Sequence, residues 1–121
     1  MKRTLLICTM MWPALLAPTR LHAHAFLDHA EPAVGSKVAH APTQVKIWFS
    51  EDIESAFSSI KVLDSANHEV QQGKAQTDKA HRQILQVGLP ALASGSYKVT
   101  WRAVSVDTHV TQGTFSFTVG P

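Results

Sequence analysis

The sequence predicts an all-β protein, either an antiparallel β-sandwich or a small Greek-key barrel of about seven short strands. Short stretches of the chain alternate between apolar and polar residues with the period of two that a half-buried strand requires. Turn-forming residues separate these stretches, and no segment of about ten residues reads as a convincing helix. The chain has 121 residues and no internal repeat, so it holds one domain at most.

The first half of the chain predicts three strands. Residues 24–31 form a first edge strand, and the Pro and Gly of residues 32–36 mark a turn after it. Residues 44–50 alternate cleanly, with one face made of Val45, Ile47 and Phe49 and the other of Lys46 and Trp48. Residues 51–54 are acidic and predict a loop or a single helical turn, which leads into a shorter strand at residues 59–63.

The second half contains the clearest strand. Residues 64–83 are polar and poorly patterned, and they predict a hairpin around Asn67 and Gly73. Residues 84–89 form a strand that Pro90 closes. Residues 96–104 alternate without interruption, with an inward face of Tyr97, Val99, Trp101 and Ala103. Residues 113–119 close the chain with an inward face of Phe115, Phe117 and Val119.

The N-terminus has the layout of a secretory signal peptide: a basic start, an apolar run from Thr4 to Ala17, and small residues at the end. We therefore expect residues 1–23 to be removed and residues 24–121 to form the mature domain. Pattern rules also allow an Ala-x-Ala cut directly before Phe26, which would remove His24 as well. A buried N-terminal helix and a lipoprotein cysteine at Cys8 are the disfavoured alternatives.

Removing the leader changes the composition. The remainder has 8 basic and 9 acidic residues, so the apparent basicity belongs to the leader, and nucleic acid or an anionic membrane is not indicated as a partner. All Cys and Met residues lie in the leader. The mature chain is thus predicted to lack disulfides, a soft Cu(I) site and a blue-copper centre, because these need sulfur ligands.

The Asp107-Thr108-His109 motif lies on a loop between the last two strands and is the best candidate for chemistry. Residues two apart in extended backbone point to the same side, so this motif presents a carboxylate and an imidazole together. If His24 becomes the first residue, its α-amine and Nδ1 can chelate one metal ion, and His109 can supply a third nitrogen. Asp107 is then an axial ligand, or it orients a bound water or the amine. Imidazole suits Cu(II), Zn(II) and Ni(II).

The other histidines are weaker candidates. We expect His40, His68 and His81 to be solvated surface residues, while the pattern leaves His29 open. A hydrolase is disfavoured because no Gly-x-Ser-x-Gly elbow is present and because Ser105, Asp107 and His109 are too close in sequence for a standard catalytic triad.

These residues resemble the CopC family of periplasmic copper-binding proteins over nearly all of residues 24–121. The resemblance is carried by an ordered set of motifs: His24 at the start, Pro32-Ala33-x-Gly35, Phe49-Ser50-Glu51, Leu89-Pro90-x-Leu92, Gly95-x-Tyr97-x-Val99-x-Trp101, Ser105-x-Asp107-x-His109, and Gly113-x-x-x-Phe117. It implies a seven-stranded Greek-key β-barrel of Ig-like or cupredoxin-like shape. It also favours cleavage after Ala23.

The resemblance implies one Cu(II) site at one end of the barrel. Its ligands would be the amine and Nδ1 of His24 together with His109, with Asp107 close by and Glu51 also near the site. Some members of the family have a second, Met-rich Cu(I) site in the middle of the chain. This sequence has no Met there, so it is similar to the Cu(II)-only members.

We therefore expect a monomeric periplasmic Cu(II) carrier or buffer in copper homeostasis or resistance, with a CopD-like inner-membrane copper transporter as partner. No enzymatic activity is expected. One alternative is a histidine-brace oxygenase, but such enzymes are usually larger with a flat aromatic surface, and Trp48 is the only aromatic residue predicted to face outward from a strand. The other alternative is a metal-free Ig-like binding module.

Overall fold

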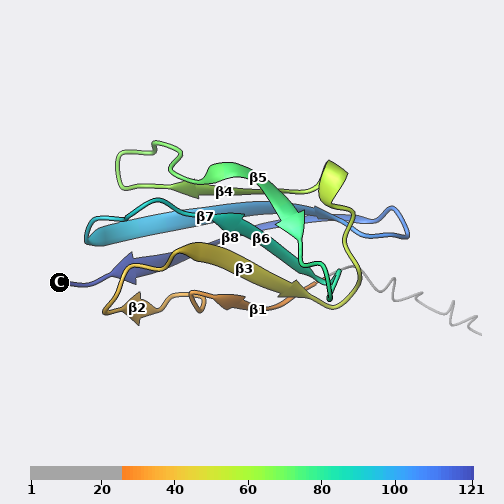
Figure 1. Cartoon of the computed structure of the whole chain (residues 1–121), viewed down its shortest axis with the longest axis horizontal. Coiled ribbons are helices and arrows are strands. Elements are labelled where there is room, and N and C mark those ends of the chain that lie inside the picture. The colour runs from red at the N-terminus through yellow and green to blue at the C-terminus, as the bar shows by residue number, and fades with distance from the viewer. Residues whose placement is uncertain (1–25) are drawn as a thin grey trace, which may run out of the picture.

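Two four-stranded sheets face each other in the computed structural model, which describes residues 26–121 (Figure 1). The leader, its cleavage site and His24 lie outside the described residues. The predicted all-β sandwich is confirmed. In the first sheet the strand order is β1 (Leu27–Glu31), β3 (Gln44–Phe49), β6 (Ile84–Gly88) and β5 (Gln72–Thr77). In the second it is β2 (Lys37–Val38), β8 (Val110–Val119), β7 (Gly95–Val104) and β4 (Ser59–Leu63).

The strands form where the sequence alternates. Along β7 and β3 every second side chain is buried, as a strand with one face on a core requires. The inward faces meet in a single core, which includes Val45, Ile47, Phe49, Ile60, Val62, Leu85, Val87, Tyr97, Val99, Trp101, Phe115 and Phe117. The predicted inward faces of residues 44–50, 59–63, 96–104 and 113–119 are thereby confirmed.

Two details differ from the sequence prediction, and a third agrees with it. The turn at Asn67 exists, but Gly73 lies inside β5, and β4 and β5 belong to different sheets, so residues 64–83 are not one hairpin. The acidic segment at residues 51–54 agrees with the prediction of a loop or a single helical turn, since it is a loop that leads into the short 3-10 helix η1 (Ser55–Phe57). The two-residue β2 pairs in parallel with β8 and adds an eighth strand. This strand is too short to show an alternation of apolar and polar residues in the sequence.

The long hairpin of β7 and β8 positions the candidate site. Its ladder runs without a break from Gly95↔Val119 to Val104↔Val110, so the loop at residues 105–109 projects from a rigid base. This loop, η1 and the start of β1 lie at the same end of the sandwich (Figure 1). Among residues 26–121, no helix has the length and apolar character needed to cross a membrane.

Candidate metal centre

The loop between β7 and β8 is held by its own backbone. The Ser105 N–H donates to the His109 carbonyl oxygen at 3.0 Å, and the Thr108 N–H donates to the Ser105 carbonyl oxygen at 2.9 Å. Thr108 adopts a left-handed conformation, with φ of 69°. These bonds close a tight turn, so Asp107 and His109 have fixed backbone positions.

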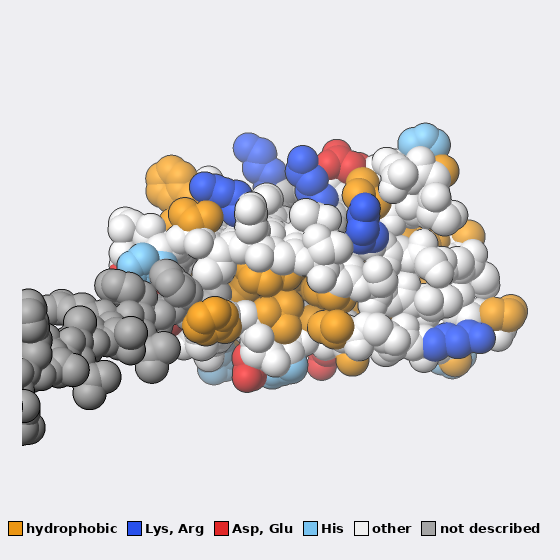
Figure 2. Space-filling model, turned by 180° about the vertical axis from the view of Figure 1, so that it is seen from behind, with side chains coloured by type: hydrophobic (Ala, Val, Ile, Leu, Met, Phe, Trp, Pro, Cys, Tyr) orange, Lys and Arg blue, Asp and Glu red, His pale blue; other side chains and the backbone are white. Residues whose placement is uncertain are grey.

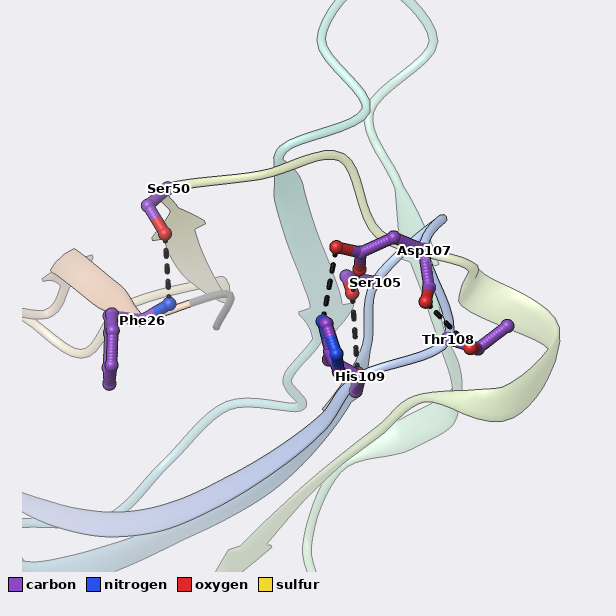
Figure 3. Close-up of polar contacts among 6 residues, drawn as sticks. All are labelled: Phe26, Ser50, Ser105, Asp107, Thr108 and His109. Atoms are coloured by element: carbon purple, nitrogen blue, oxygen red, sulfur yellow. Dashed lines mark hydrogen bonds and ion pairs between the residues drawn. The ribbon is translucent and has the colours of Figure 1, made fainter. Parts of the chain in front are cut away.

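The side chains of Ser105, Asp107 and His109 form one polar network (Figure 3). Asp107 Oδ2 lies 3.1 Å from His109 Nδ1, and Asp107 Oδ1 accepts a short hydrogen bond from Ser105 Oγ. The Ser105 hydrogen bond holds the pKa of Asp107 below its ordinary value, with burial opposing this and the nearby His109 supporting it. An ionised carboxylate can only accept, so Nδ1 of His109 carries a proton, and Nε2 of the neutral ring keeps its lone pair.

Ser105 is the one fully buried polar side chain in the described part of the chain. In a catalytic triad the histidine lies between the nucleophile and the carboxylate. Here the carboxylate lies between the serine and the histidine, because Ser105 Oγ bonds to Asp107. This order differs from that of a standard triad, because the histidine does not bond to the serine hydroxyl.

Two further segments meet the loop at this end of the sandwich. The Phe26 N–H donates to Ser50 Oγ at 2.9 Å, and the Ser50 N–H donates to the Phe26 carbonyl oxygen at 3.0 Å. Two residues later, the Asp52 carbonyl oxygen accepts from the Val106 N–H at 3.1 Å. The segment at residues 50–52 therefore bridges the start of β1 and the loop that carries His109, and Figure 3 shows both sides of this bridge.

The predicted site residues are brought together in part. Asp107 and His109 are in contact. Glu51 lies between Ser50 and Asp52 in the bridging segment and is half-buried. His24 lies outside the described residues. Within residues 26–121, no three His, Cys, Asp or Glu side chains are grouped closely enough to hold a metal ion. The described chain thus supplies a histidine–carboxylate pair, and a metal ion would need donors beyond that pair.

The remaining histidines lie elsewhere. His40, His68 and His81 are exposed, as predicted. His29, which the sequence left open, lies on β1 with its ring stacked on Trp48 at a centroid distance of 4.3 Å. Its Nδ1 is 2.9 Å from Asp28 Oδ2. Trp48 therefore faces outward, as predicted, and it is half-buried with the ring of His29 stacked on it.

One cleft in the described part of the chain contains none of the predicted site residues. It has a volume of about 690 Å³ and lies between η1, β4 and β5, where its charged lining residues are Lys61 and Lys74. No histidine or carboxylate lines it. Its chemistry does not suit a cation, so the Asp107–His109 pair remains the candidate metal site.

Sequence reasoning missed two residues that build this end of the molecule. No bond between Ser105 and Asp107 was predicted, although Ser105 lies two residues before Asp107 on an extended strand, a spacing that could have indicated a partner for the carboxylate. Ser50 was recognised only as part of a motif. Its bond to Phe26 joins residues 24 positions apart in the chain, and no local pattern announces such a contact.

Comparisons with known proteins point to one family. Residues 27–120 match the CopC domain family. The chain is 36% identical to Protein YobA of Escherichia coli K12 over 107 residues, which cover 88% of this chain and 86% of YobA. It is 35% identical over 117 residues to copper resistance protein C of Pseudomonas syringae pv. tomato, which covers 92% of each chain. It also matches copper transport protein CutJ of Bacillus subtilis at 35% identity over 104 residues, covering 85% of this chain and 19% of CutJ.

Solved structures agree. The crystal structure of CopC from Methylosinus trichosporium OB3b superimposes with a TM-score of 0.76 at 39% identity, covering 81% of this chain and 95% of that one. The crystal structure of PcoC, a methionine-rich copper resistance protein from Escherichia coli, has a TM-score of 0.70 at 33% identity, covering 80% of this chain and 99% of PcoC. The sequence resemblance is confirmed: this chain belongs to the CopC family.

Proposed function

We propose that the mature chain is a periplasmic Cu(II)-binding protein that acts as a copper carrier or buffer in copper homeostasis or resistance. The observation that carries the proposal is the Asp107–His109 pair, in which Nδ1 is tied to the carboxylate and the imidazole is held at the end of the sandwich where β1 begins. Membership of the CopC family, whose named relatives include copper resistance and copper transport proteins, supports copper as the ligand.

The missing donors are proposed to come from His24. On this proposal residues 1–23 are a signal peptide, and cleavage after Ala23 makes His24 the first residue of a domain that ends at residue 121. Phe26 is fixed to Ser50, and two residues of chain reach about 7 Å at most. The α-amine and Nδ1 of His24 would then chelate one Cu(II), with His109 Nε2 as the third nitrogen.

Asp107 is proposed to orient His109 rather than to be a strong ligand. Both of its oxygens are engaged, one by Ser105 and the other by His109, and a carboxylate behind a ligating histidine typically fixes the ring and raises its basicity. Glu51 is proposed as an additional acidic group near the ion. Its place in the bridging segment supports this role.

We propose a carrier rather than an enzyme because one relative is a copper transport protein. The start of the chain has the pattern of a secretory leader, and the domain is proposed to be monomeric. CutJ is a copper transport protein in which the matched region makes up 19% of the length. A similar domain is thus joined to a copper transport protein in that relative, which supports a CopD-like inner-membrane transporter as partner here.

The test is a Cu(II) titration of the processed protein. We expect one equivalent to bind and to give a tetragonal, nitrogen-rich EPR signal, because imidazole and amine nitrogens suit Cu(II). His109→Ala should weaken binding strongly and change the signal, whereas His68→Ala, at an exposed histidine in the turn that follows β4 at the other end of the sandwich, should change neither. A stoichiometry near zero, or a signal unaffected by His109→Ala, would contradict the assignment.

Selectivity gives a second prediction. The mature chain contains no Cys and no Met, so it lacks the thiolate and thioether ligands that Cu(I) prefers. We expect little affinity for Cu(I), in contrast to what the methionine-rich composition of PcoC suggests for that protein. Competition against a Cu(I) chelator under reducing conditions checks this, and retention of Cu(I) by the protein would show that the ligand set is wrong.

An activity assay distinguishes the oxygenase alternative from the proposed carrier. An oxygenase supplied with ascorbate and Cu(II) would produce peroxide or oxidise a substrate catalytically, whereas a carrier would not. Sustained turnover by the copper-loaded protein, lost in His109→Ala, would favour the enzyme over the carrier.

A further inference from the structure

The end of the sandwich that carries Asp107 and His109 also carries most of the exposed large apolar side chains. The described chain has five of them, and only Val34 lies elsewhere. The other four are Phe26, Phe57, Val106 and Val110, which are 47% to 66% exposed and which we call the apolar rim. Figure 2, seen from behind, shows hydrophobic side chains beside a histidine at the left-hand end of the molecule, which is this end. Single exposed apolar residues are ordinary, but a group around one functional site marks an interaction surface.

Each side chain of the apolar rim stands on an anchored backbone. Phe26 is bonded to Ser50 in both directions, and the Val106 N–H donates to the Asp52 carbonyl oxygen. Val110 pairs with Val104 in the β7–β8 ladder. The Phe57 carbonyl oxygen accepts from Arg102 Nη1 at 2.7 Å. Backbone hydrogen bonds therefore hold these side chains in their exposed positions. Ordering this surface on binding a partner would cost little free energy.

The charges around the apolar rim indicate the chemistry of the partner. Glu51 and Asp52 lie in the bridging segment, and neither forms an ion pair with another described residue. Glu54 is already paired with Arg82 at 3.1 Å, and Arg102 lies beside Phe57. Lys61 and Lys74 line the cleft on the β4–β5 side of η1, away from the loop. The margin next to the loop is thus acidic, which complements a basic surface and opposes an acidic one.

We propose that the apolar rim is the docking surface for the protein that gives copper to this chain or takes copper from it. The partner surface is apolar at its centre, basic at its margin, and presents a copper ligand toward His109. This inference rests on the proposed function, because copper exchange requires donor and acceptor ligands to meet at the ion. Apolar side chains that surround the ion would exclude water while the ligands exchange.

Val34 provides the matched control. It is 57% exposed, like the residues of the apolar rim, but the neighbouring Gly35 N–H bonds to the Ser116 carbonyl oxygen. Ser116 lies six residues along β8 from Val110, which is about 20 Å of strand. A surface defined by hydrophobicity alone would include Val34, whereas a surface organised around the candidate metal site would not.

The experiment places the photo-cross-linker p-benzoylphenylalanine at position 57, 110 or 34 of the full chain, in its native host grown with copper. We expect positions 57 and 110, but not 34, to cross-link to one and the same protein, and we expect that protein, once purified, to exchange copper with this chain. Phe57→Ser should slow the exchange by about tenfold or more, since apolar anchors at an interface centre dominate binding. Val34→Ser should not change the rate, and both variants should keep wild-type Cu(II) affinity and fold.

Several outcomes would overturn the docking surface: equal cross-linking at position 34, cross-linking to a second copy of this chain, a partner that exchanges no copper, or Phe57→Ser exchanging at the wild-type rate. A separate Cu(II) titration of the wild-type protein tests the proposed function. If the protein binds no Cu(II), the proposed function fails at that step. If it binds Cu(II) normally but cross-links without preference, only the docking surface fails.

Discussion

At the scale of single residues, Ser105 decides how the imidazole of His109 is presented. Its hydroxyl donates to Asp107, and Asp107 in turn accepts from the Nδ1–H of His109. A copper site built on His109 would therefore depend on a buried serine that need not touch the ion. Groups behind a metal ligand typically change metal affinity by about 10–100-fold when they are removed.

We predict that Ser105→Ala lowers Cu(II) affinity by about tenfold without unfolding the protein, because alanine keeps the backbone bonds of the loop but leaves Asp107 Oδ1 without this donor. The same change should raise the pKa of Asp107 in the metal-free protein, since the Ser105 bond is the main cause of its lowered pKa. Competition titration measures the affinity, and carboxyl NMR measures the pKa.

Ser116→Ala, at an exposed serine on β8, is the control for Ser105→Ala. It should leave both the Cu(II) affinity and the pKa of Asp107 as in the wild type. If Ser105→Ala bound copper normally and left the pKa of Asp107 unchanged, the serine would have only a packing role.

At the scale of elements, the β7–β8 hairpin supports the loop through close packing of Trp101 on Gly113. The two residues are partners in the ladder, and a Cβ atom built on Gly113 would lie 2.7 Å from the indole of Trp101. The indole is 7% exposed and also packs edge-on against Phe49 at 5.1 Å between ring centroids. A side chain at position 113 would have to displace this ring from the core.

We predict that Gly113→Ala destabilises the protein by about 1–3 kcal/mol through overpacking. For a domain of this size, each kcal/mol lowers Tm by about 4–8 °C. Thermal unfolding followed by circular dichroism and Trp fluorescence measures the change. Gly88→Ala in β6 is the control, because its added Cβ would lie 3.7 Å from the nearest atom, which is an ordinary contact. Equal Tm values for Gly113→Ala and the wild type would show that the core accommodates the methyl group.

The predictability of these elements follows from what each one depends on. The strands at residues 44–50 and 96–104 could be predicted because alternation is a local property of a strand with one buried face. The two-residue β2 could not, since two residues carry no period. Asp107 and His109 were predicted together because their spacing decides which side they face. The bonds of Ser50 to Phe26 and of Asp52 to Val106 could not be predicted, because they depend on how distant segments meet.

At the scale of the whole molecule, the proposed site requires a free N-terminus. We predict that adding one residue before His24 weakens Cu(II) binding by orders of magnitude, on the order of a hundredfold or more, because an amide nitrogen is a far poorer ligand than an amine. His24→Ala should have a similar effect, since it keeps the amine and loses the imidazole. Competition titration of the two variants measures the loss.

Circular dichroism is the folding control for these N-terminal variants, because residue 24 precedes the anchored Phe26 and the core should persist without its side chain. Mass spectrometry of the secreted protein shows whether His24 is the first residue. If the extended protein bound Cu(II) as tightly as the wild type, side chains alone would hold the ion. His29 would then be an unlikely helper unless it left its stack on Trp48.

The bridge at residues 50–52 also bears on when during its lifetime the protein could acquire metal. It joins the first strand to a loop about 80 residues later, so the two proposed halves of the site are far apart on any chain that has not yet folded. With its leader attached, the newly made chain would also lack the free amine. On the proposed function, such a precursor cannot bind copper at this site until it has been exported, its leader has been cleaved and the domain has folded. Copper would then bind only in the compartment where the leader is cleaved and the domain folds. No additional mechanism would be needed to keep the cytoplasmic precursor free of copper.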